Sequence, residues 1–87
     1  MIAYLSDIAV IGKGMFSNEV IVQYYDSRGK VIEGFFDKQF VKEHGLEVSV
    51  LYSNDKRAMI IAPQDGFLEM PKILAVPRED IFYARAA

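Results

Sequence analysis

The sequence predicts a small, mostly β domain in which short antiparallel strands form a barrel. Two observations support this prediction. Turn-forming residues recur at short intervals along the 87 residues, and the runs between them are rich in Val, Ile, Tyr and Phe. Short strands at such spacing are typical of small barrels and sandwiches. The length accommodates one domain, over residues 1–87, and leaves no room for a second.

The clearest predicted strand covers residues 46–53, where apolar and polar side chains alternate with the period of two of a half-buried strand. Leu51 is an apolar exception on the polar face. The apolar face is expected to carry Leu46, Val48, Val50 and Tyr52. The other strands, about six to seven in all with this one, are predicted at 2–11, 19–26, 30–37, 57–62, 72–76 and 81–85.

Two hairpins are predicted from the turns between these strands. Residues 26–29 read Asp-Ser-Arg-Gly, with Asp at the first turn position and Gly at the fourth. This pattern favours a tight hairpin with a glycine bulge. Residues 54–56 are expected to form the second turn, which would pair the strand at 57–62 with the strand at 46–53.

Residues 37–44 differ in character and predict one short helix. Asp37 can cap the start of a helix, and Gly45 can take the left-handed conformation that ends one. Phe40 and Val41 are the apolar points of this segment, with charged residues around them. We therefore expect one or two helical turns that cross the barrel.

The segment AVPREDIFY, residues 75–83, predicts a 3₁₀ turn at 77–80 followed by the last strand, because Pro77 fixes the first φ of the turn. One strand, a loop, two hairpins, a 3₁₀ turn and a last short strand make an order that is similar to SH3-like barrels. The resemblance implies a small antiparallel SH3-like barrel. SH3 domains that bind proline-rich peptides carry a Trp and an acidic loop. This chain has no Trp and no acidic cluster after its first strand, so that activity is not carried over.

The composition excludes several kinds of chemistry. No Cys is present, which excludes disulfides, thiolate catalysis and cysteine-based metal sites, and favours a reducing compartment. His44 is the one histidine, and no nucleophile forms a recognisable motif with it. We therefore expect no enzyme activity, no catalytic residue, no metal and no cofactor.

Charge and hydropathy indicate where the protein acts. The net charge is −2, and acidic residues interleave with the ten Lys and Arg, so no basic stripe accumulates. The first fifteen residues lack a basic region, and Asp7 interrupts their apolar run, which predicts neither a signal peptide nor a membrane span. The expectation is a cytoplasmic protein with no membrane partner.

Adjacent aromatic residues provide the best functional indication. Neighbours in a strand point to opposite faces, so one member of Tyr24–Tyr25 and of Phe35–Phe36 can fill the core while the other needs cover outside. We take Tyr25 and Phe36 as interaction candidates. The predicted strands 2–11, 57–62 and 72–76 are also apolar on both faces, a pattern that favours an interface.

The turn at residues 13–20, KGMFSNEV, adds two further candidates. Met15 and Phe16 follow a glycine and precede the turn formers Ser17 and Asn18. The pair either folds under the barrel as a plug or stands out as an anchor for a partner.

These observations favour a small non-enzymatic interaction module that self-associates through apolar strand faces, or that binds another protein. A small barrel that binds nucleic acid through exposed aromatic residues is the first alternative. A protein that binds a small molecule is the second, although the sequence shows no convergent polar groups for a cleft.

Overall fold

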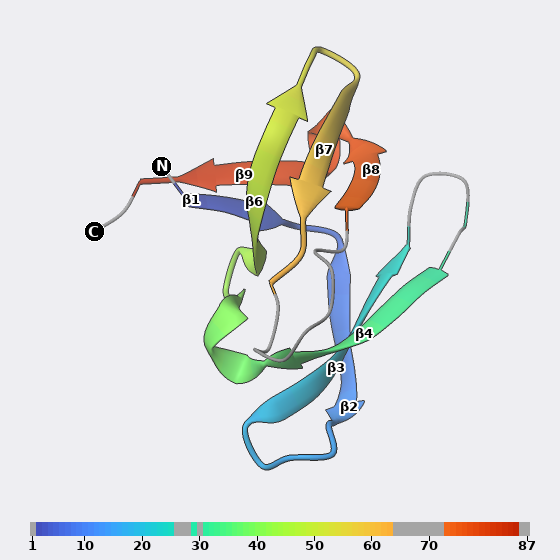
Figure 1. Cartoon of the computed structure of the whole chain (residues 1–87), viewed down its shortest axis with the longest axis vertical. Helices are drawn as coiled ribbons and strands as arrows, with labels where there is room; N and C mark the ends of the chain where they lie inside the picture. The colour runs from blue at the N-terminus through green and yellow to red at the C-terminus, as the bar shows by residue number, and fades with distance from the viewer. Residues whose placement is uncertain (1, 26–28, 30, 64–72, 86–87) are drawn as a thin grey trace.

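The computed structural model describes residues 2–25, 29, 31–63 and 73–85. Its strands form two antiparallel sheets (Figure 1). One sheet has the order β8-β7-β6-β1-β9, with β5 also paired to β6, and the other has the order β2-β3-β4. The strands are β1 (Ile2–Leu5), β2 (Ile8–Lys13), β3 (Glu19–Tyr25), β4 (Val31–Asp37), β5 (Val41–Lys42), β6 (Gly45–Ser53), β7 (Arg57–Ile61), β8 (Ile73–Pro77) and β9 (Ile81–Ala84).

The prediction of a mostly β, antiparallel fold is confirmed, and every predicted strand has a counterpart in the structure. The predicted strand 2–11 differs in one respect. The chain bends at Ser6 and Asp7 and divides this segment into β1 and β2, which belong to different sheets. Over the described ranges the strands therefore form two sheets and no single closed barrel.

The predicted turns are found where the structure describes them. The strands β3 and β4 pair as a hairpin, and Gly29 has a φ of 79°, while the turn residues 26–28 lie outside the described residues. The second hairpin is confirmed by the antiparallel pairing of β6 with β7. In its turn, Asn54 Oδ1 accepts hydrogen bonds from the amides of Lys56 and Arg57 at 2.8 and 2.9 Å. The predicted 3₁₀ turn is also present, as η2 (Arg78–Asp80).

The short helix expected over residues 37–44 is not confirmed. A single 3₁₀ turn, η1 (Lys38–Phe40), is followed at once by β5, and the described part of the chain contains no α-helix. Asp37 does cap the turn, because its side chain accepts a hydrogen bond from the amide of Gln39 at 2.9 Å. Val41 then takes extended angles and pairs with Leu46 across the β5–β6 hairpin, which ends the helical geometry after one turn.

The core lies where the inner faces of the two sheets meet. Tyr24 of the three-stranded sheet belongs to the same buried cluster as Leu5, Ile60 and Val76 of the larger sheet. Ile8 and Phe36 pack against this cluster from the three-stranded sheet. Each large aliphatic side chain that is fully removed from water contributes about 1.5–3 kcal/mol, so this cluster holds the two sheets together.

A polar contact also joins the sheets at the bend of the chain. The Tyr24 hydroxyl donates a hydrogen bond to Asp80 Oδ2 at 2.5 Å. The carbonyl oxygen of Asp80 accepts two hydrogen bonds from Ser6, from the amide at 2.8 Å and from Oγ at 2.9 Å. Asp80 in η2 therefore fixes both the bend between β1 and β2 and the position of β3.

We expect Tyr24→Phe to lower the free energy of unfolding by about 1–2 kcal/mol, because a part-buried carboxylate loses a hydrogen-bond donor. In a domain of this size the melting temperature should fall by roughly 4–16 °C. Thermal unfolding followed by circular dichroism measures the change. Tyr25→Phe is the matched control, since it removes the same hydroxyl from the exposed neighbour, and equal melting temperatures for the two variants would contradict the role of Asp80.

Candidate interaction surface

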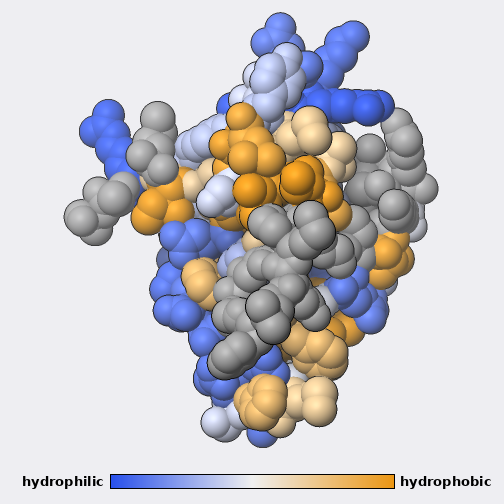
Figure 2. Space-filling view, in the orientation of Figure 1, coloured by the Kyte–Doolittle hydropathy of each residue, from blue (hydrophilic) through white to orange (hydrophobic). Residues whose placement is uncertain are grey.

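The loop between β2 and β3 presents Met15 and Phe16 to solvent. Their side chains are 82% and 66% exposed, so the pair does not act as a plug under the sheets. Figure 2 shows apolar side chains at the lower end of the molecule, where Figure 1 places this loop. We call Met15 and Phe16 the loop tip.

Backbone contacts hold the loop tip in place. Glu19 receives a hydrogen bond from the amide of Gly14 at 2.9 Å and donates its own amide to the Phe16 carbonyl at 3.0 Å. The Asn18 side chain donates to Asp37 Oδ2 at 2.8 Å, which ties the loop to the end of β4. Gly14 is needed here because a Cβ at this position would lie 2.4 Å from Glu19 Cβ.

A second apolar surface is the outer face of the three-stranded sheet. Val22 and Tyr24 point into the core, so the residues that alternate with them point outward. The register of β3 with β4 places each of these residues opposite an outward residue of β4, so the pairs form three rows across the two strands. In the middle row, Gln23 Nε2 donates a hydrogen bond to Glu33 Oε1 at 2.6 Å. We call this surface the β3–β4 face; it consists of Ile21, Gln23, Tyr25, Val31, Glu33 and Phe35.

Of the two aromatic candidates on strands, Tyr25 lies on the surface and Phe36 packs against the core. Tyr25 is exposed and lies opposite Val31 on the β3–β4 face. Phe36 instead packs against the core cluster, and its ring lies over Gly34, where a Cβ would come within 2.9 Å of Phe36 Cε2. Phe35 is the outward member of its pair at 54% exposed and takes the place of Phe36 in the candidate surface.

A third apolar surface lies on the outside of β6, β7 and β8. The register of β6 shifts at Leu51, so beyond this bulge Tyr52 lies opposite Met59 on the outer side rather than on the inner face expected for it. Ala58 and Ile60 point inward between the outward residues of β7. We call this surface the β7–β8 face; it consists of Tyr52, Arg57, Met59, Ile61, Ile73, Ala75 and Pro77.

His44 belongs to a small aromatic cluster that sequence reasoning did not find. Its ring stacks on Phe82 with centroids 4.6 Å apart and lies 5.5 Å from the ring of Tyr4. Tyr4 and Phe82 face each other across β1 and β9, so the β5–β6 turn brings His44 over the outside of this sheet. The pairing of the first and last strands creates the cluster, and no local motif indicates it.

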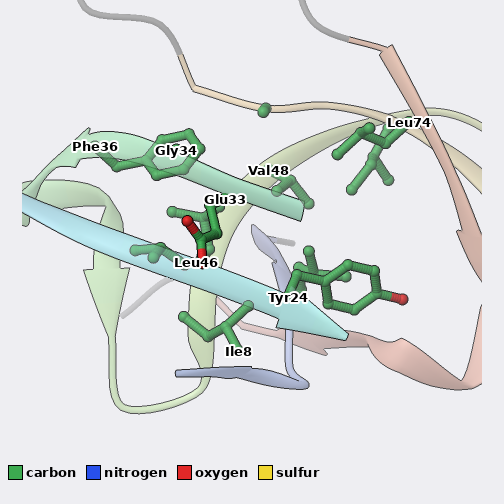
Figure 3. A pocket seen from close by; sticks show the side chains of 12 residues that line it. Ile8, Tyr24, Glu33, Gly34, Phe36, Leu46, Val48 and Leu74 are labelled. Carbon is green, nitrogen blue, oxygen red and sulfur yellow. The ribbon is translucent and has the colours of Figure 1, made fainter. Parts of the chain in front are cut away.

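The inter-sheet space contains a small cavity of about 20 Å³ (Figure 3). Ile8, Tyr24, Phe36 and Leu74 are among the side chains around it. This volume is close to that of one water molecule, whereas ligand pockets measure roughly 300–1,000 Å³. A larger hollow of about 440 Å³, near Val50 and Tyr83, is open to solvent where β6 diverges from β1.

No protein-family model, no curated protein and no solved structure matches the chain. The residues that the structure describes include no group of three or more His, Asp or Glu side chains able to hold a metal ion. Within the same residues, no helix has the length and apolar character that crossing a membrane requires.

Proposed function

We propose that this protein is a small non-enzymatic interaction module that self-associates through its apolar strand faces. The observation that carries the proposal is the β3–β4 face, on which Tyr25, Val31 and Phe35 are exposed on a regular sheet. Exposed aromatic and aliphatic side chains on one surface commonly mark a protein interface. The loop tip adds Met15 and Phe16 as candidate anchors, held by the turn that ends at Glu19.

We propose further that the fold is an SH3-like barrel elaborated by the three-stranded sheet. The strand order β8-β7-β6-β1-β9, with η2 directly before β9, supports this assignment. On this interpretation β2, β3 and β4 form a long insertion after the first barrel strand, and the β3–β4 face belongs to the insertion. The absence of cysteine supports a cytoplasmic location.

Two alternative functions receive less support from the same surfaces. A nucleic-acid site could use the exposed rings of Tyr25 and Phe35 for stacking, but Glu33 on the same face opposes the approach of phosphates. A small-molecule site would need a more enclosed cleft than the structure describes, because the cavity between the sheets measures only about 20 Å³ and the hollow of about 440 Å³ near Val50 and Tyr83 is open to solvent.

Phe35→Thr tests the proposed function. Threonine preserves the β propensity of the strand, so we expect the melting temperature to stay within about 2–4 °C of the wild type. Loss of the exposed ring should weaken self-association at least fivefold, because aromatic anchors contribute most of the energy of an interface. Sedimentation equilibrium over a wide concentration range measures the association constant.

Phe16→Thr is the matched comparison, because it removes the same ring from the loop tip. A loss of association for both variants would place the loop tip and the β3–β4 face in one interface. If the wild type remains a monomer of 9.9 kDa at all concentrations, self-association is wrong and the apolar faces serve a different partner.

A further inference from the structure

The chain carries two apolar sheet faces on different sides of its core. The inner side chains of β3 and β4 and those of β7 and β8 pack against one buried cluster, so the outer faces of the two hairpins point away from it. A contact that covers the β3–β4 face therefore leaves the β7–β8 face open. Two copies related by a single two-fold axis would cover only one of these faces.

The two faces carry opposite charges. Glu33 lies in the middle row of the β3–β4 face and is held there by its hydrogen bond with Gln23. Arg57 lies on the β7–β8 face at the start of β7, between Asn54 and the exposed Met59. The adjoining turn carries Asp55 and Lys56, and η2 beside it carries Arg78 and Glu79. The charges cancel within each of these pairs, so Arg57 sets the sign of that face among the described residues.

Charge complementarity decides which faces can meet. Pairing the β3–β4 face with itself brings Glu33 toward Glu33 of a second copy near the centre of the contact, where like charges are strongly unfavourable. Pairing it with the β7–β8 face, shifted along the strands by one row, brings Glu33 toward Arg57 and covers most of both apolar surfaces. We propose that copies of this chain associate head to tail, with the β3–β4 face of one copy on the β7–β8 face of the next.

This inference rests on the proposed self-association and specifies its geometry. Two strands of seven residues at the usual spacing make a β3–β4 face of roughly 24 by 10 Å, about 240 Å². Stable interfaces bury about 800 Å² per partner, so each contact is weak and reversible. A head-to-tail contact repeats at both ends, and the assembly therefore grows with concentration into a ring or a filament.

Reversal of each charge tests the geometry. Glu33→Arg and Arg57→Glu each place like charges in the head-to-tail contact. For the wild type, association raises the average mass above the monomer mass, and each variant alone should lose at least half of this increase at the same protein concentration. An equimolar mixture of the two variants should regain it, because every contact between unlike copies is again complementary. Light scattering on a sizing column measures the mass, and circular dichroism confirms that both variants fold.

The outcomes separate this geometry from the proposed function. Wild-type mass that rises beyond a dimer, with recovery in the mixture, supports the head-to-tail contact. If the wild-type mass stops at twice 9.9 kDa, the head-to-tail contact is wrong but self-association is correct. The same conclusion follows if Arg57→Glu associates like the wild type. A wild type that is monomeric throughout overturns the geometry and the proposed self-association together.

Discussion

Replacing Gly45 with alanine is expected to lower the free energy of unfolding by about 4 kcal/mol or more. Gly45 has a φ of 129°, a conformation that side chains rarely adopt. A Cβ at this position would also lie 2.1 Å from the carbonyl oxygen of Leu5. The clash is with backbone, so relief requires β1 and β6 to move apart at Leu5↔Leu46, the end pair of their ladder in the larger sheet.

Two other glycines separate the two causes of this loss. Gly29→Ala meets no atom within 4 Å but has a φ of 79°, so it should show the conformational cost alone, about 1–2 kcal/mol. Gly12→Ala would place its Cβ 3.7 Å from Ile21 Cδ1, an ordinary contact without a positive φ. Urea unfolding measures all three variants. A Gly45→Ala variant no less stable than Gly29→Ala would show that Leu5 does not restrict this position.

The second large effect is expected for Ile60→Ala, with a loss of about 2–5 kcal/mol. The Ile60 side chain is 0% exposed and belongs to the cluster that both sheets share. Its truncation would enlarge the existing cavity of about 20 Å³, which Ile60 lines together with Tyr24 and Phe36. The melting temperature should fall by at least 8 °C, because each kcal/mol corresponds to roughly 4–8 °C in a domain of this size.

Met59→Ala is the matched control for Ile60→Ala. Met59 is the next residue of β7 but is 42% exposed on the opposite side of the strand. Its truncation should change the free energy of unfolding by about 0.5 kcal/mol or less in the dilute monomer. Calorimetry at low protein concentration measures both variants, and equal losses would mean that β7 does not divide its side chains between core and solvent.

Strands and turns could be predicted from the sequence because their signals are local. Alternation in 46–53 and the Pro77 turn each depend on neighbouring residues, and both elements are present. The helix expected at 37–44 fails because only one turn fits between β4 and β5. The capping signal of Asp37 is real, but it serves a 3₁₀ turn, and the positive φ of Gly45 serves a strand start rather than a helix end.

The faces of the strands depend on register, which local patterns do not contain. The bulge at Leu51 shifts Tyr52 to the outside, although strict alternation places it with Val50. Phe35 and Phe36 are adjacent aromatics, and only the pairing Val20↔Phe36, beside buried Val22, decides that Phe36 turns inward. The sequence therefore predicts that exposed aromatic residues on strands form the candidate surface, but without the register it does not predict which aromatic residues these are.

The pairing of β1 with β9 has a consequence for biosynthesis. Among the strands described here, β1 is synthesised before the others; it lies between β6 and β9, and the bend that follows it is held by Asp80, 74 residues away from Ser6. The meander of β2, β3 and β4 involves only short loops and can form early, whereas the larger sheet is complete only after β9 has been synthesised. During translation, β1 is therefore an open strand edge, and a stalled or shortened chain that ends before Ile81 would expose it to aggregation.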